Sequence, residues 1–506
     1  MNVEAQSFPQ VHTARDRSTS HRLLGLSWPL LLGIAALLLQ VGMSWGLRDP
    51  DPYWQIVVGD WMLAHHQIPT WDLFSYTMPG APATTQEWGA EIIVALAYRL
   101  AGWSGLVLLA GVTFALTLAY VARFLLRRLE PLHAVTLTCL TGAMMFPLSM
   151  ARPHAIIWPL AAIWFKNLVE AAEARRGPPW WLLVVMCLWA NLHGSFILGL
   201  ALIVPFALES ILEARRTLSY TQYRSLLTRW ALFFAAACGC VLLNPVGYHA
   251  LLFPFHMLAM KSVLGLISEW RSPDFEQPQG LAIWLLALLA LTLSGRFRLP
   301  WVRTTLLLGL TYMALQHQRN VPLLALISPF ILAGPLAAQR KDTAPDNNVL
   351  DRIFHALTPP ASWSSACVAL TASLIVAAVI LRVDRPEPTH YSPVQAVNAL
   401  LASGTNGPIL NDYNFGGYLI FRGIPVFIDS RADMYGEKFV MRTLETMWLS
   451  RPGFEELLEQ YHIQSTLLPA DAAAARLLDR LPGWKRLYSD DIAVVHVRNT
   501  GAATTQ

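Results

Sequence analysis

The sequence has little charge and little cysteine for its length. Only 14% of its 506 residues are Asp, Glu, Lys or Arg, against about 25% in an ordinary soluble chain. The five cysteines all lie inside apolar runs, without a Cys-x-x-Cys pair or a Cys/His metal spacing. A disulfide-stabilised secreted scaffold is therefore excluded, and we interpret the cysteines as small packing side chains.

An excess of one charge is also missing. The chain has 37 Lys and Arg against 33 Asp and Glu, a formal net charge of +4, which is too small to predict a nucleic-acid partner. Apolar residues are abundant instead, at 54% of the chain and a mean hydropathy of +0.41. This composition excludes a disordered chain and predicts an α-helical polytopic membrane protein.

About eleven apolar runs have the length of a membrane span. The first, 23–46, follows an arginine-containing segment at 1–22 and is too long for a signal-peptide core. We therefore predict an uncleaved first span with its N-terminal tail, 1–22, in the cytoplasm. The other runs lie near 103–126, 133–150, 155–170, 179–193, 195–213, 228–244, 280–295, 301–317, 320–338 and 363–381.

The basic residues give a test of this topology. If the spans alternate, five basic pairs fall on the cytoplasmic side, as the positive-inside rule requires: Arg127-Arg128, Arg175-Arg176, Arg215-Arg216, Arg296 with Arg298, and Arg340-Lys341. The transmembrane domain is then 23–381. Its first outer loop, 47–102, and the tail, 382–506, are predicted on the periplasmic side of a bacterial cytoplasmic (inner) membrane.

Both outer segments have local patterns. The apolar part of 89–100 spans about a dozen residues and contains Glu91 and Arg99, which favours an interfacial or re-entrant helix over a span. The tail predicts a small α/β domain with a tight turn at Gly416-Gly417. Its expected strands are PILN, GYLIF, PVFID, STLLP and IAVVHV, and its expected helices lie within 436–461 and 471–481.

Two acids come directly after the first span. Asp49 and Asp51 lie in a Pro-containing turn followed by Tyr53 and Trp54. Carboxylates close to apolar and aromatic groups are candidates for a general base. The alternative is a solvated loop in which Asp forms turns and the aromatics lie at the membrane interface.

Further polar side chains recur at the predicted outer ends of spans. Each alone is explained as a helix cap or a snorkelling side chain. Together they predict an outward-opening polar cavity, because ionisable groups at membrane depth face a bundle interior or water. Arginine binds phosphate bidentately, so this cavity suits an anionic, lipid-linked substrate. The residues are Arg152, His154, His193, Glu269, His317 and Arg319.

These features resemble the GT-C superfamily of integral membrane glycosyltransferases. The segment DPDPYWQIVVGDWMLAHHQIPTWDLFSYT is similar to a bacterial branch of it, although Gln55 stands where that branch often has His. The resemblance covers nearly the whole chain. It also rests on Arg152-Pro153-His154, Asn191-Leu192-His193-Gly194, Asn244-Pro245, Glu269-Trp270 and the tail segment NDYNFGGYLIF…PVFIDSRADMYG.

The resemblance implies an inverting transfer of sugar from a polyprenyl-phosphate donor to an acceptor hydroxyl. Carried onto this chain, Asp51 is the first candidate base and Asp49 the second. Arg152, Arg319 and the histidines would stabilise the leaving phosphate. Part of the superfamily uses a divalent metal, which Asp49, Asp51 and Glu269 could hold, but metal-free chemistry is the expectation.

Two other functions stay open from the sequence alone. A lipid or polysaccharide transporter or flippase would favour broken helices and a repeat, and no repeat is visible. A non-catalytic cell-envelope assembly protein would present its tail to a partner, and its loop acids would tolerate substitution.

The tail also contains charged residues that could bind an acceptor, or that could belong to turns and strand ends. They are Asp412, Asp429, Asp433 and Arg431.

Overall fold

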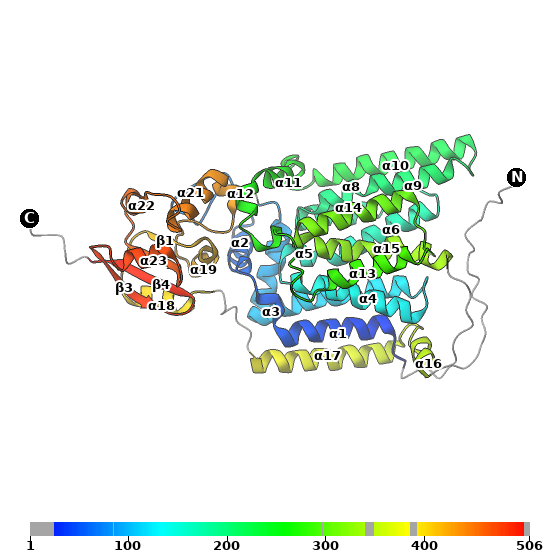
Figure 1. Ribbon diagram of the computed structural model, residues 1–506, viewed down its shortest axis with the longest axis horizontal. Helices are drawn as coiled ribbons and strands as arrows, with labels where there is room; N and C mark the ends of the chain where they lie inside the picture. The colour runs from blue at the N-terminus through cyan, green and yellow to red at the C-terminus, as the bar shows by residue number, and fades with distance from the viewer. Residues whose placement is uncertain (1–24, 84, 296, 340–348, 385–391, 500–506) are drawn as a thin grey trace, which may run out of the picture.

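The computed structural model describes residues 25–83, 85–295, 297–339, 349–384 and 392–499. A long bundle of helices carries a small α/β domain at one end (Figure 1). The predicted tail at 1–22 lies outside the described residues, as do Arg296, Arg340 and Lys341.

Helices occupy all the predicted apolar runs. Among the described residues, six helices are long and apolar enough to cross a membrane, and four further apolar helices are shorter. The protein is therefore an α-helical polytopic membrane protein with a small C-terminal sheet domain. The bundle helices are α1 (Trp28–Met43), α3 (Trp88–Leu125), α4 (Pro131–Met145), α6 (Trp158–Glu173), α7 (Leu182–Leu192), α8 (Phe196–Ala201), α9 (Ile203–Ala214), α10 (Tyr220–Val241), α13 (Gly280–Leu293), α14 (Trp301–Gln316), α15 (Val321–Ala338) and α17 (Trp363–Asp384).

Local signals set several helix boundaries. Proline in the first turn begins α1, α4, α6 and α15, where its missing N–H has no intrahelical partner to lose. Ser219 and Gln222 form a capping box at the start of α10. Within α3 the backbone is non-helical at Ala101 and Gly102, so the predicted short segment before residue 101 is separated from the run that follows.

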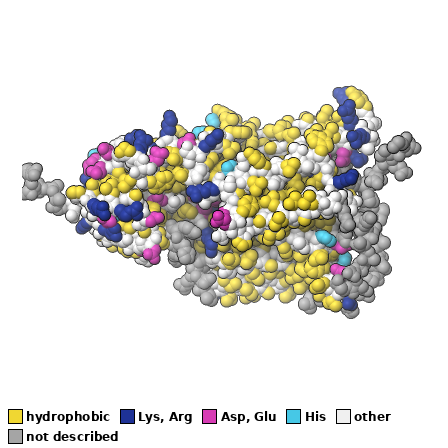
Figure 2. All heavy atoms as spheres, in the orientation of Figure 1, with side chains coloured by type: hydrophobic (Ala, Val, Ile, Leu, Met, Phe, Trp, Pro, Cys, Tyr) yellow, Lys and Arg dark blue, Asp and Glu magenta, His cyan; other side chains and the backbone are white. Residues whose placement is uncertain are grey.

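Consecutive long helices run in opposite directions. The basic pairs at 127–128, 175–176 and 215–216 therefore fall at the bundle end opposite the C-terminal domain, and Figure 2 shows Lys and Arg gathered there. The buried Arg303 lies at the same end, with Nε 2.7 Å from Glu209 Oε1 and Nη2 3.0 Å from Glu173 Oε1. This network joins α14 to α9 and α6 because each partner comes from a different helix.

The C-terminal domain contains a four-stranded sheet in the order β1-β2-β4-β3. β1 (Ile409–Asn411) pairs in parallel with β2 (Ser465–Pro469), which pairs antiparallel with β4 (Ala493–Arg498), and β4 pairs antiparallel with β3 (Trp484–Ser489). Leu467 lies opposite Val495 in the buried centre. The associated helices are α18 (Val394–Ala402), α19 (Gly416–Phe421), α20 (Ala432–Tyr435), α21 (Glu437–Met447), α22 (Phe454–Gln460) and α23 (Ala473–Leu478).

Three predicted strands are confirmed, and two are wrong. GYLIF forms helix α19, and PVFID makes only an isolated bridge between Val426 and Ser75. The predicted turn at Gly416-Gly417 is also wrong, because these glycines begin α19 and permit close backbone contact. A Cβ at Gly416 would lie 2.4 Å from Ile428 O, and one at Gly417 would lie 3.0 Å from Pro50 O. Strand β3 was not predicted, because its pattern is largely polar.

The first outer loop packs against the C-terminal domain. It contains α2 (Asp51–His65), whose Tyr53 ring lies 5.1 Å from Tyr418 and 5.2 Å from Phe421. Tyr76 N–H donates to Val426 O at 3.1 Å. Loop and tail thus cover one end of the bundle together. The remaining short helices are α5 (Pro153–Ile156), α11 (His249–Ala259), α12 (Lys261–Leu264) and α16 (Val349–Ala356).

Candidate active site

Arg152 lies at the centre of the predicted polar residues. It is the extended N-cap residue of α5. Its Nε lies 3.1 Å from Asp49 Oδ2, while its two terminal nitrogens pair with Asp51 and Glu269. The structure therefore brings four predicted site residues into direct contact, although the sequence separates Asp51 from Arg152 by 101 positions.

The two acids of the Asp-Pro-Asp motif have different partners. Asp49 Oδ1 accepts the Asp51 N–H at 2.8 Å, which closes a turn directly before α2. Asp51 Oδ1 accepts the Ser430 hydroxyl at 2.6 Å and the Trp54 indole N–H at 3.3 Å. The motif therefore forms a turn, as the alternative interpretation expected, and also presents both carboxylates to Arg152.

These environments shift the pKa values of the two acids in opposite directions. Burial raises the pKa of Asp49 to about 7; Arg152 opposes this rise, and the charges of Asp51 and Glu269 add to it. Burial also opposes ionisation of Asp51, but Arg152 and the hydrogen bonds from Ser430 and Trp54 hold its pKa below the ordinary value. At neutral pH, Asp51 is therefore ionised while Asp49 is partly protonated.

The three carboxylates do not fit a metal site. Asp49, Asp51 and Glu269 each direct an oxygen at the Arg152 guanidinium, which lies where a shared cation would lie. In the described part of the chain, no group of three or more His, Cys, Asp or Glu side chains is arranged to hold a metal ion. We therefore derive no catalytic step through a metal.

The predicted histidines lie close together beside this cluster. The rings of His154 and His193 are 6.2 Å apart. His154 Nε2 lies 2.7 Å from Leu148 O. Burial lowers the pKa of His154 to about 4, and burial, with the charges of His154, Arg319 and Arg152, also holds the pKa of His193 well below its ordinary value. Both rings are neutral at pH 7, so they serve as hydrogen-bonding groups and not as fixed cations.

Glu87 is a site residue that the sequence did not indicate. Its Oε1 accepts the Gly194 N–H at 3.3 Å and lies 3.7 Å from His193 Nε2. Burial raises its pKa to about 7, against the lowering effects of Gly194, Arg319 and Arg152. The available signal was a carboxylate directly before the apolar run at Trp88, which is also the pattern of an ordinary helix start.

Arg319 and His317 both contact Trp270, the residue that follows Glu269. The Arg319 guanidinium carbon lies 4.3 Å from the centre of the Trp270 ring, and His317 Nδ1 lies 2.5 Å from Trp270 O. Among the described residues, no carboxylate lies within 4.0 Å of the Arg319 guanidinium. In the described chain, Arg319 thus has no ion-pair partner within this distance, whereas Arg152 has three.

The asparagine motifs have structural partners. Asn191 Oδ1 accepts the Trp88 indole N–H at 2.7 Å. The Asn244 side chain donates to Gln86 O at 3.1 Å and to Ala190 O at 2.9 Å. These bonds fix the start of α3 against α7, which positions Glu87 beside His193.

The tail acids are engaged within the protein. Arg431 pairs with Asp429 at 2.6 Å and with Asp72 of the first outer loop at 3.0 Å. Asp412 Oδ1 accepts the Asn414 N–H at 2.9 Å. These contacts favour the turn and strand-end interpretation for Asp412, Asp429 and Arg431 over an acceptor-binding role.

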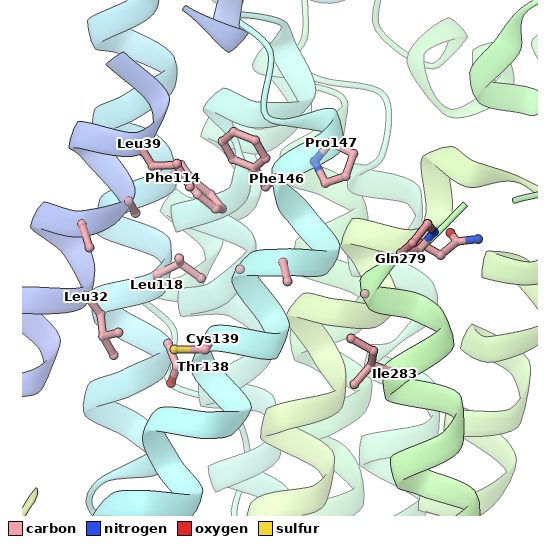
Figure 3. A pocket seen from close by; sticks show the side chains of 16 residues that line it. Leu32, Leu39, Phe114, Leu118, Thr138, Cys139, Phe146, Pro147, Gln279 and Ile283 are labelled. Carbon is pink, nitrogen blue, oxygen red and sulfur yellow. The ribbon is translucent and has the colours of Figure 1, made fainter. Parts of the chain in front are cut away.

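An apolar groove lies on the flank of the bundle. It has a volume of about 610 Å³ and is formed by α1, α3, α4 and α13 (Figure 3). Its end at Phe146 and Pro147 lies in the turn whose Leu148 carbonyl contacts His154. The groove therefore begins close to His154 and the polar cluster around Arg152. Other lining residues include Leu32, Leu39, Phe114, Leu118, Cys139, Gln279 and Ile283.

No protein-family model matches the chain, and no curated protein matches it. Three of the solved structures that are similar to this chain come from two organisms. ArnT from Cupriavidus metallidurans bound to undecaprenyl phosphate has 13% sequence identity to this chain and a TM-score of 0.45. ArnT from the same organism in the apo state has 15% sequence identity and a TM-score of 0.48. In both cases, 94% of this chain and 99% of that chain are covered.

The third structure is an oligosaccharyltransferase from Archaeoglobus fulgidus in the apo form. It has 11% identity and a TM-score of 0.49, over 87% of this chain and 69% of that chain. Likeness at this level concerns the overall fold alone.

Proposed function

We propose that this protein is a glycosyltransferase that moves a sugar from a polyprenyl-phosphate donor to an acceptor hydroxyl at the periplasmic face of the inner membrane. One observation carries the proposal. A buried carboxylate pair, Asp49 and Asp51, lies at the same end of the bundle as Arg319, a guanidinium with no ion-pair partner within 4.0 Å in the described chain. Such a site combines a proton acceptor with an anion-binding group.

Asp51 is the proposed base. It is ionised at neutral pH, and its side chain is 16% exposed against 8% for Asp49. Its carboxylate takes the acceptor O–H proton while that oxygen bonds to the anomeric carbon. The bond from this carbon to the phosphate oxygen breaks at the same time, which inverts the configuration. Asp49 is the second candidate, because a pKa near the working pH favours proton transfer.

Arg319 is the proposed partner of the donor phosphate. Negative charge grows on this phosphate as the sugar leaves, and a preorganised guanidinium stabilises it. Glu269 and Arg152 hold the mouth of the site together, while the neutral His154 and His193 supply hydrogen bonds. The groove that begins at Phe146 suits part of the apolar polyprenyl chain, because it faces the flank of the bundle.

The transporter and assembly alternatives predict other phenotypes. We would delete the gene in the source bacterium and compare envelope glycans and lipid-linked sugars by mass spectrometry. The proposal predicts that one glycan modification disappears and that its polyprenyl-linked sugar accumulates on the periplasmic side. Accumulation of the same lipid on the cytoplasmic side would indicate a flippase. Loss of an envelope assembly with both glycan and lipid pools unchanged would indicate an assembly protein.

A further inference from the structure

A residue of the C-terminal domain contacts the proposed base directly. Ser430 Oγ lies 2.6 Å from Asp51 Oδ1, although the two residues are 379 positions apart. The other carboxylate oxygen of Asp51 pairs with Arg152. Apart from Ser430, Oδ1 has only the weaker indole contact with Trp54 at 3.3 Å. The Ser430 hydroxyl is therefore the main contact that fixes this oxygen.

Ser430 is itself held from both sides. Its carbonyl accepts the Tyr413 hydroxyl at 2.9 Å. The next residue, Arg431, pairs with the fully buried Asp429 at 2.6 Å and with Asp72 at 3.0 Å. Asp72 belongs to the same outer loop as Asp51, so this ion network ties the serine segment to the loop that carries the base.

We infer that Ser430 is a positioning residue for Asp51, so that the C-terminal domain completes the active site of the transmembrane domain. The inference rests on the proposed function. The hydroxyl donates to Oδ1 while Arg152 contacts Oδ2, and these two contacts set the direction in which the carboxylate faces the acceptor. A carboxylate free to rotate would spend less time in a productive geometry.

The test compares Ser430→Ala with Ser430→Thr, which keeps a hydroxyl, and with Ser489→Ala as the control. Ser489 is an exposed residue of β3 in the same domain. Membranes of the deletion strain supply donor and acceptor, and purified variants are added across pH 5 to 9. We expect Ser430→Ala to lower the transfer rate about tenfold to a hundredfold, the range for a hydrogen bond to a charged group.

Two further readouts separate positioning from folding. Loss of the Ser430 bond raises the pKa of Asp51, so the acid limb of the rate profile should move to higher pH. Ser430→Thr should restore both rate and profile. An active Ser430→Ala protein with the wild-type rate and profile would overturn the inference. Absence of transfer by the wild-type protein would instead overturn the proposed function.

Tyr413→Phe gives a second, milder variant. It removes the bond to the Ser430 carbonyl and leaves the serine hydroxyl in place. We expect a smaller loss of rate than for Ser430→Ala, with the same direction of shift in the pH profile. Should Ser430→Ala fail to fold, this variant decides: an unchanged rate and profile would contradict the inference.

Discussion

At the scale of single residues, the site depends on how three acids share one arginine. Each of Asp49, Asp51 and Glu269 directs an oxygen at Arg152, so the cluster keeps an excess of negative charge. Burial raises the pKa of Asp49 and this excess adds to the rise, whereas Arg152 and the hydrogen bonds from Ser430 and Trp54 keep the pKa of Asp51 low.

Asp49→Asn should change how stability depends on pH. The pKa of Asp49 rises from 3.8 to about 7 on folding, so the folded state binds this proton more tightly than the unfolded state. The free energy of unfolding then falls as pH rises from about 4 to about 7. The variant has no carboxyl group at this position, so its stability does not fall in this way. We expect the Tm difference in detergent, variant minus wild type, to be a few degrees more positive at pH 8 than at pH 5.

The control for this measurement is Asp60→Asn, on the same helix. Asp60 lies in an exposed ion pair with Arg99, so its Tm difference from wild type should be small at both pH values. An Asp49→Asn difference that is equal at pH 5 and pH 8 would contradict the raised pKa.

Arg319→Gln should weaken binding of the lipid phosphate. The side chain lies over Trp270 without an acidic partner within ion-pair distance in the described chain, so its charge is available to a ligand. Native mass spectrometry with undecaprenyl phosphate measures the effect directly. We expect a Kd at least about tenfold higher, as for loss of a charge-assisted hydrogen bond. Arg271→Gln, at an exposed position nearby, is the control, and equal binding by both variants would disprove the assignment.

Part of this site could be predicted from residues alone. Asp49, Asp51, Arg152 and Glu269 stand beside apolar runs, and alternation of the spans places them on one side. Ser430 could not be found in this way, because its contact crosses 379 positions and its neighbours resemble turn residues. Which acids pair with Arg152 also depended on packing that no spacing encodes.

At the scale of elements, the crossing of α2 and α3 positions the base. Gly59 of α2 approaches α3 so closely that a Cβ would lie 2.2 Å from Glu91 O. Gly59→Ala must therefore push α2 away and move Asp51, at the cost of about 1–3 kcal/mol typical of overpacking. We expect a lower Tm and a reduced transfer rate.

Gly309→Ala is the matched control for this substitution. Gly309 lies within α14, where a Cβ would meet no atom within 4 Å. Alanine there should leave Tm unchanged or raise it, since glycine is the weaker helix former by about 1 kcal/mol. Equal effects of both substitutions would show that the α2–α3 contact is not tight.

The long elements were predictable, and the short ones were not. Apolar runs of span length must form helices in a membrane, because unpaired backbone groups are too costly there. The tail segment GYLIF has strand-like composition, but Gly416 and Gly417 fit it as a helix against Pro50 and Ile428. Tertiary packing overrides local preference in such short segments.

At the scale of the whole molecule, the basic end and the site end lie on opposite sides of the bundle (Figures 1 and 2). The positive-inside rule then predicts a periplasmic active site. In a variant with the five cysteines replaced, Ser489→Cys should react with a membrane-impermeant maleimide in cells with a permeabilised outer membrane. Ser219→Cys, at the start of α10, should react only after lysis. The reverse pattern would contradict the topology.

The most direct test of the central claim is complementation of the deletion strain with Asp51→Asn and Asp60→Asn. Both variants replace one carboxylate of α2 by an amide, but only Asp51 contacts Arg152. Glycan transfer is measured by mass spectrometry at equal amounts of membrane-inserted protein. The account predicts that Asp60→Asn restores the missing glycan and that Asp51→Asn leaves the lipid-linked sugar accumulated. Full restoration by Asp51→Asn would contradict the account.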